Sequence, residues 1–327
     1  MTGEPLINFV TDAPLPPGEL AQWRHLSWDQ GDAIMSRDPW IWPAYYWMGR
    51  SLYTVNLSNE PRQDAINVMT ARRLRQWRGY VPGQWFVVAV RGEDVAFPYA
   101  QLEVVHHAAQ GGQGAHVILP FTPPGVGPRE RGRAQVFNVG LALPAEENGI
   151  PIDRLRCILG DMGLRLADRS QSEHGHDLGC VDVLLGVHGL DGRDHPRWSS
   201  RPLQTAWQAR IPFIGGFEAA YSELGEPDRD YLRVADEAGL KHALWTLKLN
   251  PYRYHCLVQA GERQLERCDA AWVGERWAQF IHRVVLPAFQ AWYAGHPDMC
   301  NAMCKKFAFN VLERSPLRRL TRLALYH

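Results

Sequence analysis

Short apolar runs bounded by glycine, proline and polar residues recur along the whole chain. Runs such as 85–90, WFVVAV, and 181–187, VDVLLGV, have the length and the β-branched content of buried strands. They alternate with segments in which apolar residues return every three or four positions, for example 151–163. Because strands that alternate with helices form parallel sheets covered by helices, the pattern predicts an α/β protein with doubly wound sheets.

The same pattern predicts where the main elements lie. We expect strands at 6–11, 53–57, 65–68, 85–90, 101–106, 115–119, 135–139, 181–187, 211–214 and 230–234. We expect helices at 71–78, 151–163, 201–210, 238–249, 250–265 and 271–286, with Pro287 breaking or kinking the last one.

A segment rich in proline, glycine and arginine at 121–133, FTPPGVGPRERGR, is the best candidate for a linker. The length of 327 residues suffices for two domains that each have a core. We therefore expect a first domain at 1–125, a second at 126–285 and a basic C-terminal segment at 286–327.

The stretch 201–225 carries the clearest candidate chemistry. It reads as a helix, a short buried strand, the turn Gly215-Gly216 and a second helix. Paired glycines allow close approach of a ligand, and the N–H groups that open the next helix favour an anion such as phosphate. Arg197 and Arg201 precede the stretch and offer positive charge; acceptors for sugar hydroxyls follow the glycines at Glu218, Ser222 and Glu223. The alternative is that the two glycines only form a turn.

This stretch resembles the nucleotide-sugar-binding segment of GT-B glycosyltransferases, which in one bacterial group has the form K-L-x-N-A-W-x-A-G-V-P-x-I-x-G-x-E-x-A-Y. The residues that match this form in order are Leu203, Ala206, Trp207, Ala209, Pro212, Ile214, Gly216, Glu218, Ala220 and Tyr221. Three further phrases resemble the same group, at 56–62, 124–133 and 230–234. The resemblance covers roughly residues 50–280.

The resemblance implies a GT-B type α/β fold, in which two Rossmann-like doubly wound domains face a cleft and the second binds the donor. His188 stands where the group has a basic residue, which implies contact with the donor phosphates. Arg197 and Thr205 occupy the places of the two glutamates of the retaining branch, so a standard retaining site is not expected. By the same resemblance, Thr205 is expected to lie in the donor-binding site.

Asp12 directly follows the first predicted strand. Ligands of open α/β sheets bind beyond the carboxyl ends of the strands, so Asp12 is the candidate catalytic base. The alternative is that its carboxylate caps or braces the following loop.

Histidines and cysteines suggest no metal centre. His106 and His107 are adjacent on a predicted strand and would point to opposite faces. The run at 172–177, SEHGHD, has no identifiable distant partner, so a solvated loop is favoured there. The 6 cysteines show no zinc-binding spacing. We expect no metal and no cofactor other than the nucleotide sugar as co-substrate.

The composition indicates which classes of partner the protein could bind. Lysine plus arginine equals aspartate plus glutamate at 35 each, so the overall charge does not indicate nucleic acid. The N-terminus has neither a basic region nor a long apolar run, which favours a cytoplasmic protein. At 301–327 basic and apolar residues are interleaved, as in a segment resting on an anionic membrane or a helix docked on the body.

With these features, the resemblance implies a metal-independent glycosyltransferase that moves a sugar from a nucleotide-diphosphate sugar to a hydroxyl of a glycan, a lipid-linked or a natural-product acceptor. A non-catalytic GT-B-like subunit that binds nucleotide sugars or a partner is the alternative. A Rossmann oxidoreductase is disfavoured, because no GxGxxG follows the first strand.

Overall fold

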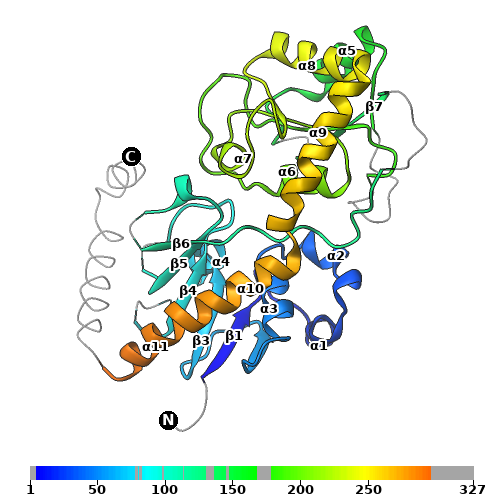
Figure 1. The fold of residues 1–327 in the computed structure, drawn as a ribbon. Coiled ribbons are helices and arrows are strands. Elements are labelled where there is room, and N and C mark those ends of the chain that lie inside the picture. Colours follow the sequence, from blue (N-terminus) through cyan, green and yellow to red (C-terminus); the bar gives the residue numbers. More distant parts are fainter. Residues whose placement is uncertain are drawn as a thin grey trace.

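Two parallel sheets, one in each half of the chain, organise the structure (Figure 1). It is a computed structural model that describes residues 5–77, 80, 83–97, 99–112, 114–129, 136–144, 147–167 and 178–295. The first sheet has the strand order β2-β1-β3-β4-β5-β6 and the second the order β11-β10-β9-β7-β8. Strand order reverses beside β1 and beside β7, as it does in doubly wound folds.

The strands of the first sheet are β1 (Leu6–Val10), β2 (Val55–Ser58), β3 (Ala65–Thr70), β4 (Phe86–Val90), β5 (Leu102–Val105) and β6 (Ala115–Val117). Those of the second are β7 (Asn138–Leu141), β8 (Arg165–Leu166), β9 (Val183–Gly186), β10 (Phe213–Gly215) and β11 (Leu232–Arg233). Every residue of β3, β4 and β9 is buried, which explains why these strands read as continuous apolar runs.

Helices cover both sheets. The first-domain helices are α1 (Pro17–His25), α2 (Asp32–Met35), α3 (Ile41–Met48) and α4 (Ala71–Gln76), and the second-domain helices are α5 (Ile152–Asp161), α6 (Arg201–Gln208), α7 (Ala219–Leu224), α8 (Glu237–Leu249) and α9 (Pro251–Gln264). Their starts follow capping rules: Asp236 accepts from the Gly239 N–H at α8, and Asn250 accepts from the Arg253 N–H at α9. Single-turn 3₁₀ segments lie at Trp28–Gln30, Ala108–Gln110 and Leu265–Arg267.

The chain returns to the first domain after α9. Helix α10 (Ala270–Phe280), a π-helical turn at Ile281–Val285 and α11 (Leu286–Tyr293) run across the first domain in Figure 1. Their buried residues, among them Val273, Trp277 and Phe289, belong to the same core as β1 and β3. The expected division at residue 285 had placed α10 in the second domain. Pro287 does not break the helix but lies in the first turn of α11, directly after the π-helical turn.

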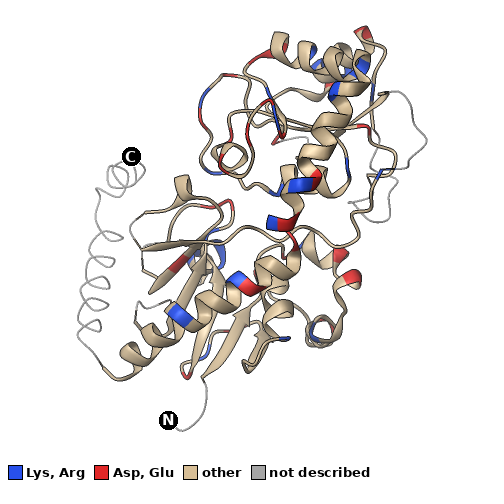
Figure 2. Cartoon of the chain, in the orientation of Figure 1, with Lys and Arg blue, Asp and Glu red and all other residues tan. Residues whose placement is uncertain are grey.

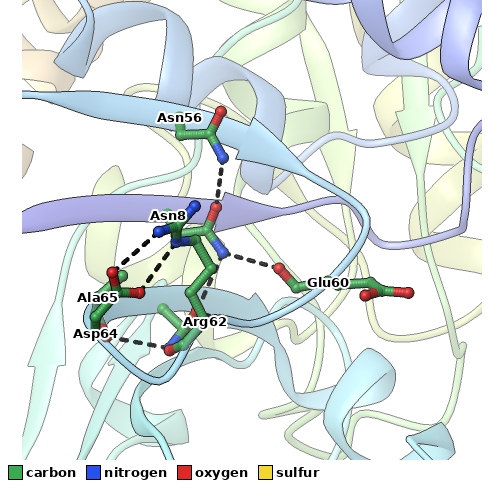
Figure 3. Close-up of polar contacts among 7 residues, drawn as sticks. Asn8, Asn56, Glu60, Arg62, Asp64 and Ala65 are labelled. Carbon is green, nitrogen blue, oxygen red and sulfur yellow. Dashed lines mark hydrogen bonds and ion pairs between the residues drawn. The ribbon is translucent and has the colours of Figure 1, made fainter.

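Two buried asparagines lie inside the first sheet. The Asn8 side chain in β1 donates to Oδ1 of Asn67 in β3 at 3.1 Å and accepts from Nδ2 of Asn56 at 2.8 Å. It also donates to the Glu60 carbonyl, and Figure 3 shows how these contacts hold the loop between β2 and β3. Buried amides have to be hydrogen-bonded, so this network fixes β1 beside β2 and β3, where the strand order reverses.

The order of the predicted elements is confirmed, with shifts at their ends. The strand expected at 135–139 is β7 at Asn138–Leu141, and the strand expected at 211–214 is β10 at Phe213–Gly215. The two-residue strand β8 was not predicted, because a run of that length has no detectable period. Within the described part of the chain, no helix has both the length and the apolar character to cross a bilayer. The segment 301–327, expected either to rest on a membrane or to dock on the body, lies outside the described residues, and both alternatives stay predictions.

Candidate functional site

A cleft of about 580 Å³ lies where the carboxyl ends of the two sheets face each other. It has the size of small-molecule sites and the position at which doubly wound folds bind ligands. The first domain contributes Asp12, Met35, Ser36, Arg37, Pro39, Trp40, Thr70, Arg72, Arg91, Glu93 and Asp94, followed by Pro123 of the connecting segment. The second contributes Ala142, Leu143, Pro144, Glu147, Leu178, Leu184, Arg197, Trp198, Arg201, Pro202 and Thr205.

Two arginines of the second domain enter this cleft at the start of α6. Arg201 is the first residue of that helix and Arg197 lies one turn before it. The helix begins here because Pro202 stands in its first turn, where its missing N–H has no intrahelical role. Thr205, one turn into α6, also lines the cleft.

Arg201 rests on an aromatic ring instead of a carboxylate. Its guanidinium carbon lies 5.5 Å from the ring centroid of Trp40, a residue of the first domain. Within the described residues its Nε has no hydrogen-bond partner. Burial lowers the pKa of the guanidinium, and the nearby charge of Glu93 partly offsets this effect. A partly buried cation without a paired carboxylate is costly, so this position favours an incoming anion.

The guanidinium of Arg197 also lies over an aromatic ring. Its guanidinium carbon lies 5.4 Å from the ring centroid of Trp198, and its Nε donates to the Glu93 carbonyl at 2.5 Å. A cation held by an aromatic face and a carbonyl keeps its charge and its remaining N–H donors. Among the described residues, no carboxylate lies within ion-pair distance of Arg197 or Arg201.

Each of the two tryptophans is backed by a histidine. The ring of Trp40 stacks on His106, with 4.4 Å between centroids, and the ring of Trp198 stacks on His188, with 3.8 Å. Gly92, at φ 62°, lets the edge of Trp40 approach, because a Cβ there would lie 2.9 Å from its Nε1. The two tryptophans are therefore fixed in orientation before any ligand binds.

His188 and Glu218 contact each other instead of the cleft. Nδ1 of His188 lies 3.0 Å from Oε1 of Glu218, which also accepts from the His188 N–H at 2.8 Å. Both side chains are buried, and neither is among the residues that line the cleft. In this arrangement the pair orients the ring that supports Trp198, whereas the sequence predicted contacts with phosphate and sugar.

The remaining predicted donor residues lie outside the cleft lining. A Cβ on Gly215 would lie 2.8 Å from Phe213 and from Tyr221, so this glycine permits close packing of strand and helix. Glu223 accepts from the Ala108 N–H at 2.9 and 2.7 Å and thus joins the two domains. Gly216 lies against the Glu218 carboxylate, and the Ser222 hydroxyl donates to the Ala219 carbonyl.

On the first-domain side, Asp12 follows β1, as predicted, and β1 lies where the strand order reverses. The Thr70 hydroxyl donates to its Oδ1, and Arg72 forms an ion pair with its Oδ2. Its backbone N–H donates to Asp38 at 3.1 Å. Asp38 is buried, and desolvation raises the pKa of its carboxyl to about 6. A substrate hydroxyl would have to displace Arg72 to reach Oδ2 of Asp12.

The histidines His106 and His107, for which the sequence did not favour a metal role, lie beside other protein groups. Nδ1 of His106 lies 2.9 Å from the Ile118 carbonyl, and burial lowers the pKa of this histidine to about 4. His107 lies 4.0 Å from Glu223. In the described ranges, no group of three histidine, cysteine, aspartate or glutamate side chains is arranged to hold a metal ion. The run at 172–177 lies outside them.

Sequence reasoning missed the residues that support the two arginines. Trp40, Trp198 and Glu93 had no recognisable motif. The only available signal was that Arg91 and Asp94 directly follow a buried strand, which places their loop at the carboxyl end of the sheet.

Solved structures with the same arrangement of two domains are GT-B glycosyltransferases. HepE from Anabaena in complex with UDP and glucose has a TM-score of 0.55 and 11% identity, over 86% of this chain and 100% of that one. Sucrose-phosphate synthase from Thermosynechococcus elongatus has a TM-score of 0.55 and 10% identity, over 86% and 99%. AviGT4, a glycosyltransferase involved in avilamycin A biosynthesis, has a TM-score of 0.53 and 11% identity, over 89% and 98%.

Sequence comparison adds no closer relationship: no protein-family model and no curated protein matches the chain. At such low identity the likeness concerns the fold. The two parallel sheets, the returning C-terminal helices and the cleft between the domains agree with it. The chain therefore has the GT-B fold, with two Rossmann-like domains that face a cleft.

Proposed function

We propose that this protein is a glycosyltransferase that moves a sugar from a nucleotide-diphosphate sugar to a hydroxyl acceptor. The observation that carries the proposal is the pair Arg197 and Arg201, which rests on tryptophans in the cleft without carboxylate partners among the described residues. Arginine binds phosphate oxygens through two parallel N–H donors, so two such side chains suit a diphosphate.

The fold neighbours support the same class of donor. HepE was solved with UDP and glucose and also with UDP-glucose, the latter with a TM-score of 0.52 to this chain. In this protein the corresponding ligand would place its diphosphate at the start of α6. The sugar would then point towards the first domain, where Asp12 and Trp40 line the cleft.

Glycosyl transfer requires that the departing diphosphate be stabilised and that the acceptor hydroxyl lose its proton. Arg197 and Arg201 supply the first requirement as fixed positive charge, so we propose that no divalent ion is obligatory. Asp12 is the proposed base. Arg72 would have to move off its Oδ2 as the acceptor enters, which makes proton removal dependent on a bound acceptor.

The alternative, a non-catalytic subunit that binds nucleotide sugars or a partner protein, is favoured by one observation. Both oxygens of Asp12 are occupied, by Thr70 and by Arg72. The alternative predicts that a nucleotide binds but that no sugar is transferred.

The test is a thermal-shift screen of the purified protein with UDP, GDP, CDP, TDP and their sugars, without added metal. The nucleotide that stabilises the protein then selects the donor for a turnover assay that measures the released nucleoside diphosphate with a panel of glycan acceptors. Stabilisation by one nucleotide, with turnover that Asp12→Asn abolishes, is expected. Binding without turnover would favour the alternative, and no binding to any nucleotide would contradict both.

A further inference from the structure

The two halves of the cleft differ in how their arginines are neutralised. On the first-domain side, each cleft-lining arginine is paired with a carboxylate within the described residues. These pairs are Arg37 with Glu19, Arg72 with Asp12 and Arg91 with Glu103, the last at 3.0 Å. The cleft-lining Asp94 is in turn paired with Arg75. On the second-domain side, Arg197 and Arg201 rest on tryptophans instead.

We infer that the first-domain half of the cleft takes an uncharged, hydroxyl-rich acceptor group, a neutral sugar, and excludes acceptors that carry a phosphate or carboxylate at that point. The inference rests on the proposed function, because it concerns the second substrate of the same reaction.

The positive charges on the first-domain side of the cleft are already neutralised. An acidic acceptor that binds beside Arg37, Arg72 or Arg91 has to displace a carboxylate that already holds the guanidinium. For Arg72 the displaced group is Asp12, whose side chain is 1% exposed, and a buried carboxylate left without its partner is costly. The arginines on this side therefore offer no net charge for an additional anion.

The hydrogen-bonding groups on this side of the cleft suit hydroxyl groups. A hydroxyl oxygen accepts a hydrogen bond from a guanidinium N–H without displacing the carboxylate that neutralises its charge. Ion pairs at the surface of a cleft thus suit several neighbouring hydroxyls better than they suit an anion. Ser36, which also lines the cleft, adds a further hydroxyl partner.

The aromatic ring of Trp40 also lines the cleft. Its orientation is fixed by His106 and Gly92. With His106 stacked on the ring and the guanidinium of Arg201 over it, Trp40 adds apolar surface to this side of the cleft but no charge that would attract a phosphate.

Saturation-transfer NMR on the full chain, loaded with the nucleoside diphosphate found in the screen, tests the inference. The probes are methyl glycosides of glucose, galactose, mannose and N-acetylglucosamine, and the 6-phosphates of the same sugars. At least one neutral glycoside is expected to receive saturation from the protein and the 6-phosphates are not. Transfer only to the 6-phosphates, or to neither class, would overturn the inference.

A charge variant tests whether the pairing of arginines with carboxylates is the reason that phosphates are excluded. Glu19 lies on α1, and Glu19→Gln leaves Arg37 without its carboxylate. Affinity for the sugar phosphates should rise roughly fivefold while affinity for the neutral glycosides stays the same. Asp153→Asn, which frees Arg156 on the surface of α5, is the matched control and should change neither. Unchanged phosphate affinity in Glu19→Gln would overturn charge pairing as the reason for exclusion. Failure of the proposed function would appear separately, as a lack of nucleotide binding in the screen.

Discussion

The two halves of the cleft both carry arginines, but only one half leaves them available. In the first-domain half the guanidinium groups of Arg37, Arg72 and Arg91 are matched by carboxylates. In the second-domain half Arg197 and Arg201 lie over aromatic rings, which hold a cation without cancelling its charge. A count of basic residues would treat these halves as equal. The way in which each cation is held separates a site for a diphosphate from a site for neutral hydroxyls.

The difference is local and does not appear in the overall charge. Figure 2 shows acidic and basic residues interspersed over both domains, in agreement with a formal net charge of zero. For the described residues, we therefore expect that a few fixed side chains in the cleft select a ligand.

The largest effect is expected from removing the free cations. Arg201→Gln should weaken binding of the nucleoside diphosphate roughly ten- to hundredfold, because a charge-assisted hydrogen bond contributes about 1.5–3 kcal/mol. Arg197→Gln should act in the same direction and somewhat more weakly, because this side chain is more exposed. Calorimetric titration measures both. Arg156→Gln, on the exposed surface of α5, is the control, and equal losses in all three variants would refute the special role of the cleft arginines.

The paired arginines should affect stability more than nucleotide affinity. Arg72→Gln removes the partner of the buried Asp12 carboxylate and should lower the free energy of unfolding by about 1–3 kcal/mol. Nucleoside diphosphate affinity should change less than about twofold, well below the loss for Arg201→Gln. Urea unfolding measures the free energy of unfolding, and calorimetry measures the affinity for the nucleoside diphosphate. An affinity loss in Arg72→Gln as large as that in Arg201→Gln would erase the distinction between the halves.

His106, which stacks on Trp40, should make the stability of the folded protein sensitive to acid. His106 is neutral in the folded state down to a pKa of about 4, whereas an unfolded histidine has a pKa near 6.5. The unfolded state thus binds a proton first as the pH falls, and stability is lost between about pH 6.5 and 4. At pH 5 the contribution of His106 should lower the free energy of unfolding by about 2 kcal/mol relative to pH 7.5, whereas Asp38, with its raised pKa of about 6, acts in the opposite direction in both proteins. His106→Gln should lose correspondingly less; the same pH slope in both proteins would show that His106 is not the cause.

The smallest effect is expected at the second aromatic support. Trp198→Leu keeps an apolar side chain beside Arg197 but removes the aromatic face and the stack on His188. Nucleoside diphosphate affinity should fall roughly threefold, the loss expected for a partly exposed cation–π contact. Trp245→Leu, at a half-exposed position on α8, serves as the control. A loss in Trp198→Leu no larger than in this control would mean that the ring does not hold Arg197 in place.

The sequence allowed the fold to be predicted because the strands are continuous apolar runs and the connecting helices are amphipathic. Asp12 lies at the cleft as predicted, since residues beyond the carboxyl ends of parallel strands share one edge. Arg197 and Arg201, chosen for their charge, and Thr205, carried over from the resemblance, also line the cleft. The sequence could not reveal that Arg201 rests on Trp40, which lies in the other domain and far away in the chain. Only the folded structure brings these two residues together.

Other residues that were predicted to bind the donor contact protein groups in this structure, and their role in binding stays a prediction. His188 and Glu218 each suit a donor substrate, but they form a buried pair with each other. Glu223 accepts from the backbone of Ala108 in the other domain. A sequence shows which groups are able to bind a phosphate or a hydroxyl, but it does not show which of them are already occupied.

The most direct test of the account is a crystal structure of the protein with the nucleoside diphosphate identified by the screen. The account predicts that the diphosphate lies at the start of α6, hydrogen-bonded to Arg197 and Arg201, with the ion pairs of Arg72 and Arg91 intact. A diphosphate bound by Arg72 or Arg91, with their carboxylates displaced, would contradict it.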